Sequence, residues 1–131
     1  MERTSLMVNH SFINKYFSRK EMSCNCGCGF MNVNTNTLKK LHLAREMAGV
    51  SFPVSSWCRC PEHNKAVGGR DNSAHLRGTA IDIRVNSSDS HKRFKIIEAL
   101  IKVGFNRIGI YDWGIHVDDD QSLPKEQIWK D

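Results

Sequence analysis

The chain has 131 residues, of which 40% are hydrophobic and 25% are charged, the composition of an ordinary globular protein. No apolar run approaches the roughly 20 residues that cross a bilayer, which argues against membrane insertion. The formal charge of +5 suits an anionic partner such as nucleic acid, anionic lipid or a cell-wall polymer, but a lysine-rich surface alone explains it equally well. We expect one domain over residues 1–131, and a monomer.

The first half of the chain predicts short elements. Residues 10–20 contain the apolar pattern of a brief helix (Phe12, Ile13, Tyr16, Phe17), and the cysteine- and glycine-rich stretch 23–29 is expected to be a loop. A helix follows "NTNT", with an apolar stripe and a terminating glycine. A short strand over 52–56 and a short helix begun by Pro61 come next. The helical stripe consists of Leu38, Leu41, Ala44 and Met47, and the helix ends at Gly49.

The second half predicts most of a sheet. "TAIDIRV" alternates strictly between two faces, and "NRIGIY" and "GIHVD" are two further strands separated by a turn at 112–114. Between them, "SDSHKRFKIIEALIKVG" predicts a helix whose apolar stripe is Phe94, Ile97, Leu100 and Ile101. The sequence therefore predicts an α+β fold, with a small, mainly antiparallel sheet and helices packed on one face.

Five cysteines form two groups, three in "SCNCGCGF" and two in "WCRCP". Their C-x-C-x-C spacing differs from the C-x-x-C pairs of a zinc ribbon. The N-terminus has no continuous apolar segment typical of a secretion signal, which disfavours a disulfide framework. Three alternatives stay open: a structural metal site, two bridges between the groups, or reduced thiols beside glycine turns. The residues concerned are Cys24, Cys26, Cys28, Cys58 and Cys60.

Two histidines and an aspartate are predicted to meet on one face of the sheet. Because side chains alternate across a strand, burial of the isoleucines in "AIDI" places Asp82 on the opposite face. The same alternation in "GIHVD" puts His116 and Asp118 on that face if both strands share a sheet. His75, in the loop ahead of the first strand, can reach back over it. Two imidazoles and one carboxylate with a vacant fourth position are the ligand set of a catalytic zinc site.

At these residues the sequence resembles the zinc D-alanyl-D-alanine carboxypeptidase family, which also includes the sonic hedgehog signalling domain and the lysostaphin-type enzymes. "SAHLRGTAID" matches the family signature S-x-H-x-x-G-x-A-x-D, and "IHVD" matches its later H-x-D strand. The resemblance extends from about residue 12 to residue 124 and is closest to the small phage and bacterial members. It implies a hedgehog-like or D-Ala-D-Ala peptidase-like fold.

The resemblance also implies roles for single residues. His75, Asp82 and His116 would bind one catalytic zinc ion. A second, structural ion at the cysteines stays possible. Arg59, in the S-x-x-x-R position of "SSWCR", would bind a carboxylate or carbonyl of the substrate, since a guanidinium matches a carboxylate. Ser73 would hydrogen-bond the substrate. Without the resemblance, Arg59 would be interpreted as a surface arginine.

The general base departs from the family pattern. Many members place an acidic residue three positions before the last histidine, where this chain has Trp113. Asp112, one residue earlier on the same turn, is our first candidate for the base. Asp118 is the second, and it would equally serve as a partner that orients an imidazole ring.

The expected function is metal-assisted hydrolysis of an amide bond in peptidoglycan stem peptides, as a carboxypeptidase or an endopeptidase of the phage-lysin kind. Such an enzyme would be made in the cytoplasm without a signal peptide and would act on the wall after release or as part of a virion. The main alternative is a non-catalytic, zinc-containing binding domain of hedgehog-like fold. A basic, cysteine-rich nucleic-acid module is disfavoured, because no helix combines a dense Lys/Arg face with interleaved aromatic residues.

Overall fold

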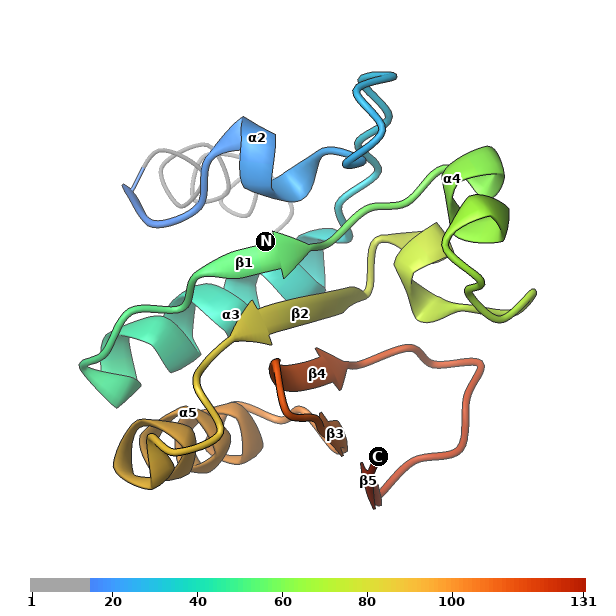
Figure 1. Ribbon diagram of the computed structural model, residues 1–131. Coiled ribbons are helices and arrows are strands. Elements are labelled where there is room, and N and C mark those ends of the chain that lie inside the picture. Colours follow the sequence, from blue (N-terminus) through green and yellow to red (C-terminus); the bar gives the residue numbers. More distant parts are fainter. Residues whose placement is uncertain (1–14) are drawn as a thin grey trace.

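The computed structural model describes residues 15–131 and shows how the helices and strands follow one another (Figure 1). The first half contains α2 (Arg19–Met22), α3 (Thr35–Ala48), β1 (Val54–Ser56), α4 (Pro61–Ala66) and a 3-10 helix (Ala74–Arg77). The second half contains β2 (Ala80–Arg84), α5 (Ser90–Lys102), β3 (Arg107–Ile110), β4 (Gly114–Asp118) and β5 (Gln127–Lys130). The fold is α+β, as the sequence predicts.

The five strands form one sheet in the order β1-β2-β4-β3-β5. All neighbours are antiparallel except β3 and β5, which run parallel. The register sets Asp82 of β2 directly opposite His116 of β4, and His116 opposite Gly109 of β3. Two residues that are paired across adjacent strands point to the same face of the sheet. Asp82 and His116 therefore share a face, as the alternation of both strands predicts.

The other face of the sheet carries the hydrophobic core. The helices α3 and α5 pack against each other and lie on that side of the sheet, α3 behind β1 and β2 in the view of Figure 1. Fully buried side chains such as Leu41 and Leu100 meet Ile81 and Ile115 there. Each such burial is worth about 1.5–3 kcal/mol, so the sheet is firmly held on the side opposite its polar residues.

The helix α3 matches its predicted bounds because its ends are well capped. The Asn34 side chain accepts a hydrogen bond from the Thr37 amide at 3.1 Å, and Gly49 ends the helix in the left-handed conformation. Its predicted stripe is right at Leu38, Leu41 and Ala44 but wrong at Met47, which is 52% exposed. The last turn of the helix instead buries Ala48, one position after Met47.

The predicted stripe of α5 is also wrong in part. Phe94 and Ile101 are 61% and 55% exposed, whereas Ile96, Ala99 and Leu100 are buried. The buried face is thus turned by about one residue from the predicted one. Alanine and one isoleucine fit between α5, α3 and the sheet, where helices must approach closely, and the bulkier Phe94 points to solvent.

Two further predictions meet the structure only partly. Phe12 and Ile13, which suggested a helix over 10–20, lie outside the described residues. Within them, Phe17 is buried in the core and α2 begins at Arg19 behind a capping box formed by Ser18 and Glu21. The strand β5 was not predicted, because "QIWK" is short and follows a polar, proline-containing stretch.

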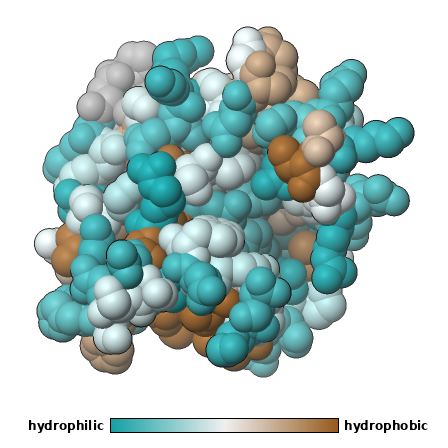
Figure 2. Space-filling model, in the orientation of Figure 1, coloured by the Kyte–Doolittle hydropathy of each residue, from teal (hydrophilic) through white to brown (hydrophobic). Residues whose placement is uncertain are grey.

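Hydrophilic side chains cover most of the face shown in Figure 2, with hydrophobic ones in small separate patches. Within residues 15–131, no helix has the length and the apolar content needed to cross a membrane.

Candidate metal centre

His75, Asp82 and His116 converge on the polar face of the sheet. Each offers one ligand atom, and the three ligand atoms lie within 4.8 Å of one another. The Asp82 carboxylate bridges the two rings, with Oδ2 at 3.2 Å from His75 Nε2 and Oδ1 at 2.9 Å from His116 Nδ1. The two imidazole rings meet edge to face, with their centroids 5.4 Å apart. The structure therefore brings together the three side chains that the sequence predicts as ligands. We call His75, Asp82 and His116 the metal group.

The backbone fixes the ring of His75 from behind. The Ser73 side chain caps the 3-10 helix by accepting a hydrogen bond from the His75 amide at 3.2 Å. His75 Nδ1 lies 2.7 Å from the carbonyl oxygen of Trp57, which can only accept, so Nδ1 carries the proton. The lone pair of Nε2 is then free and points toward Asp82, which is the tautomer that a metal ligand needs.

His116 is oriented in the same manner by a carboxylate. Its Nε2 lies 2.8 Å from Asp118 Oδ2, while Nδ1 faces Asp82. Asp118 is only 1% exposed, and its other oxygen accepts from Arg107 Nε at 2.8 Å and from the Asp120 amide at 3.2 Å. Both oxygens of Asp118 are thus engaged. A histidine that donates its second N–H to a buried carboxylate is the usual outer support of a metal ligand.

The electrostatics of the group favour a cation. Burial alone would lower the pKa of His116, but its hydrogen bonds to Asp118 and Asp82 outweigh burial and raise that pKa to about 9. Burial would likewise raise the pKa of Asp82, yet its interactions with His116 and His75 hold that pKa below its usual range. Without a metal ion, a proton on His116 supplies the positive charge that the two carboxylates require. The ligand set, the tautomers and the charge all fit a divalent metal ion.

Comparison with protein families matches residues 15–118 to Peptidase M15. The chain belongs to the peptidase M15 family. Members of this family are zinc-dependent metallopeptidases, so the chain is assigned to the hydrolases that act on peptides. No curated protein matches the chain. The match covers all three candidate ligands and ends at Asp118, before β5.

A cleft of about 750 Å³ opens beside His116, one of the three candidate ligands of this M15 peptidase. His116 and Asp118 lie on its floor, and Tyr111 and Trp129 form an aromatic wall in which Trp129 Nε1 donates to the Tyr111 hydroxyl at 2.9 Å. Arg70, Arg107 and Lys130 also line the cleft, together with the acidic Asp131. Sequence reasoning missed Trp129, because it stands on the unpredicted β5.

The two residues expected to bind substrate differ in position. Ser73 lines the cleft, although its hydroxyl already accepts from the His75 amide. Arg59 does not line it. The Arg59 guanidinium donates to Asn64 Oδ1 at 2.9 Å and to Ser56 Oγ at 3.4 Å. Burial lowers the pKa of Arg59, and the charge of Asp82 counteracts that effect, which places the guanidinium within electrostatic reach of the metal group.

The two candidates for the general base also differ in their distance from the candidate metal ligands. Asp118 is in contact with His116, but its oxygens are already occupied. Asp112 lies on the turn between β3 and β4, where it lines a different pocket with Pro53, Arg84 and Trp113. The structure thus brings Asp118 to the metal group and does not bring Asp112 there.

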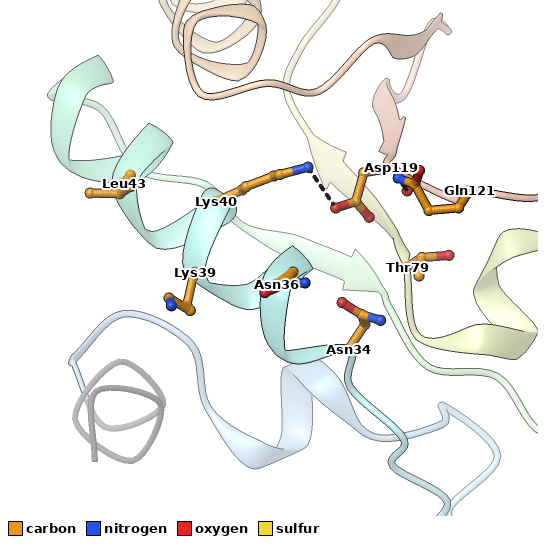
Figure 3. A pocket seen from close by; sticks show the side chains of 8 residues that line it. All are labelled: Asn34, Asn36, Lys39, Lys40, Leu43, Thr79, Asp119 and Gln121. Atoms are coloured by element: carbon orange, nitrogen blue, oxygen red, sulfur yellow. Dashed lines mark hydrogen bonds and ion pairs between the residues drawn. The ribbon is translucent and has the colours of Figure 1, made fainter. Parts of the chain in front are cut away.

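A further pocket lies beside α3, away from the metal group (Figure 3). Its charged pair is Lys40 and Asp119, whose Nζ and Oδ2 atoms are 3.1 Å apart, and Asp119 also accepts from the Thr37 hydroxyl at 2.5 Å. Asp119 directly follows β4, the strand of His116, but points to the opposite side of the sheet. Lys40 neutralises the charge of Asp119, and among the described residues Asp119 belongs to no group of possible metal ligands.

Four of the five cysteines lie together in the structure, and the fifth lies apart from them in the core. Cys24, Cys26, Cys28 and Cys60 come together as a group, and none of the chain's five cysteines forms a disulfide. Cys58 is buried in the hydrophobic core, and burial raises the pKa of its thiol to about 11. Cys58 is thus a core residue that the sequence could not separate from its neighbour Cys60.

Asp118 provides a test of how the ring of His116 is held. We expect Asp118→Asn to weaken metal binding by about 10- to 100-fold, because the amide no longer supplies a charged acceptor to His116 Nε2. Competition with a chromophoric chelator at fixed pH measures this loss. Asp112→Asn is the matched control and should leave metal affinity unchanged. Full metal affinity with a lower kcat would instead identify Asp118 as the general base.

Proposed function

We propose that this M15 domain is a zinc peptidase that hydrolyses peptidoglycan stem peptides, as a D-Ala carboxypeptidase or an endopeptidase. The proposal rests on one observation above all: His75, Asp82 and His116 offer ligand atoms within 4.8 Å of one another, and His116 also lines a cleft. Three protein ligands that leave one position vacant are the arrangement of a catalytic zinc rather than a structural one.

Zinc supplies Lewis acidity when bound, since it lowers the pKa of water and polarises a carbonyl group. The chain's own residues do the positioning. The Trp57 carbonyl holds His75 with Nε2 turned toward Asp82, and Asp118 holds His116 with Nδ1 turned toward the same carboxylate. Arg107 in turn holds Asp118 in place. Few of these groups can rotate, so the three ligands stay pre-arranged for the reaction.

The cleft favours a peptide with a free carboxylate or acidic side chains. Its basic residues attract negative charge, and the net charge of +5 suits an anionic wall polymer. Tyr111 and Trp129 offer flat apolar surfaces for the short side chains of such a peptide. We propose that Arg59 acts from outside the cleft lining through its electrostatic reach toward the metal group, and that Ser73 positions His75 as well as the substrate.

Purified peptidoglycan incubated with the zinc-loaded protein tests this function. We expect soluble products whose masses identify the bond: free D-alanine for a carboxypeptidase, or shortened cross-bridged peptides for an endopeptidase. A chelator should abolish the products and added zinc should restore them. A folded, fully zinc-loaded protein that binds the wall yet leaves every peptide intact would contradict the proposal and favour the binding domain of hedgehog-like fold.

The position of Asp112 predicts a small effect on catalysis. Because Asp112 lines a pocket at the hairpin turn and not the cleft, we expect Asp112→Asn to keep kcat within about twofold, far from the 10²- to 10⁴-fold loss of a missing general base. The release of peptide products over time measures this. A hundredfold drop in kcat with unchanged metal content would restore Asp112 as the base.

A further inference from the structure

Four thiols gather where the loop after α2 meets the connection between β1 and α4. Figure 1 shows the backbone of these two segments. The sulfur atoms of Cys24, Cys26, Cys28 and Cys60 all lie within 4.8 Å of one another. Cys24 Sγ is 3.5 Å from Cys26 Sγ, and Cys60 Sγ is 3.7 Å from both. Four sulfurs at about 2.3 Å from one zinc ion, arranged as a tetrahedron, are about 3.8 Å apart. The observed separations are close to that value and far from a covalent bond.

The loop is shaped so that three alternate residues present their sulfurs to one point. Gly27 and Gly29 both have positive φ, 85° and 87°, which bends the chain after the second and the third cysteine. The Cys24 amide donates to the Phe30 carbonyl at 2.8 Å and closes the loop at its base. Asn25 Nδ2 donates to the Ser55 carbonyl at 2.8 Å and ties the loop to β1. The C-x-C-G-C-G spacing thus produces a rigid loop with its sulfurs turned inward.

Backbone amides point at the sulfurs as they do around ionised thiolates. The Phe30 amide donates to Cys28, the Cys60 amide to Cys24, and the His63 amide to Cys60, each at 3.4 Å. Amide donors stabilise the negative form of a sulfur and leave its remaining lone pairs for a metal. Four thiolates this close would repel one another strongly, so the arrangement needs a cation at its centre.

We propose that Cys24, Cys26, Cys28 and Cys60 bind a structural zinc ion, separate from the metal group of His75, Asp82 and His116. Four thiolates around one centre select zinc among divalent ions, and a site with four protein ligands is closed to substrate. The metal replaces the thiol protons, which leave to solvent, and no sulfur is oxidised.

The structural site also supports the catalytic one. The Trp57 carbonyl that holds His75 lies three residues before Cys60, and the Arg59 amide donates to the His75 carbonyl at 3.1 Å. The Cys58 amide donates to the Met22 carbonyl at 3.2 Å, two residues before Cys24. The ion would clamp the segment 57–60 between the loop and α4. Loss of the ion should therefore loosen His75 although no cysteine touches the catalytic metal.

Metal content per chain tests the proposal. We expect two equivalents of zinc in the wild type, one in Cys26→Ser, one in His116→Ala, and none in the variant that carries both changes. Cys58→Ser is the matched control, since Cys58 neighbours the cluster but lies in the core, and it should retain two. With cobalt in place of zinc, intense thiolate charge-transfer absorption should survive His116→Ala and vanish in Cys26→Ser.

A second measurement covers cysteine variants that fail to fold. Titration of the wild type with a mercurial thiol reagent should release one zinc equivalent as four thiols react, while the second equivalent stays bound. One zinc in the wild type that Cys26→Ser leaves unchanged would overturn the proposal. So would a mass 2 or 4 Da below that of the reduced chain, which would indicate disulfides, and iron in the cluster would overturn the choice of zinc.

Discussion

Replacing His116 by alanine is expected to lower kcat/KM for peptide hydrolysis at least about a thousandfold, equivalent to about 4 kcal/mol of transition-state stabilisation. The change removes the Nδ1 atom that faces Asp82 and leaves the carboxylates of Asp82 and Asp118 without the ring between them. Two facing ligands, His75 and Asp82, hold zinc far more weakly than three. Product release from purified peptidoglycan, measured together with zinc per chain, gives the result.

His91→Ala is the control for this experiment, because His91 is an exposed residue in the first turn of α5 and is not one of the three candidate ligands. It should keep full activity and metal content. His75→Ala and Asp82→Asn should resemble His116→Ala if the three side chains act as one ligand set. Substantial hydrolysis by His116→Ala, unaffected by a chelator, would refute the metal centre described above.

Replacing Arg107 by methionine is expected to lower the free energy of unfolding by about 3 kcal/mol or more. Arg107 and Asp118 are 13% and 1% exposed, so removal of the guanidinium leaves a buried carboxylate without its charged partner. Urea denaturation of the wild type and the variant measures the difference. Arg84→Met, at an exposed arginine of β2, should change stability by less than about 0.5 kcal/mol.

The same variant should also raise KM. Arg107 Nη1 donates to the Pro124 carbonyl at 2.6 Å, and the guanidinium lies 5.2 Å from the centre of the Trp129 ring. These contacts hold the loop after β4 and the aromatic wall of the cleft. Arg107→Lys keeps the charge and should recover part of the stability, but not the bond to Pro124. Unchanged stability in Arg107→Met would show that the Asp118 carboxylate is satisfied by His116 and backbone donors alone.

The convergence of His75, Asp82 and His116 was predictable because the position of each side chain follows from a local rule. Alternation along β2 and β4 sets the faces of Asp82 and His116, and the loop signature supplies His75. The antiparallel pairing of two neighbouring strands is enough to bring them together. The cysteine cluster was predictable only as three alternatives, since sequence spacing does not say which four of the five thiols point inward.

The supports of the ligands were less accessible to sequence reasoning. The Trp57 carbonyl belongs to the backbone, so the residue type at position 57 does not indicate that it accepts a hydrogen bond from His75. Arg107 reaches Asp118 only because β3 pairs with β4, and it is one of 19 lysines and arginines in the sequence. The contacts that decide between a base and an orienting partner for Asp118 depend on such tertiary neighbours. The exposed Phe94 shows the same limit in α5, where packing space, not hydrophobicity, decides which residues are buried.

The candidate ligands and part of the cleft wall come from different stretches of the chain. All three ligands precede residue 118, whereas Trp129 and Lys130 arrive with β5, which joins the outer edge of the sheet beside β3. On the ribosome, the three candidate ligands therefore emerge before the part of the cleft wall that β5 supplies. We expect substitutions in β5 to change which peptides bind without removing any ligand of the metal.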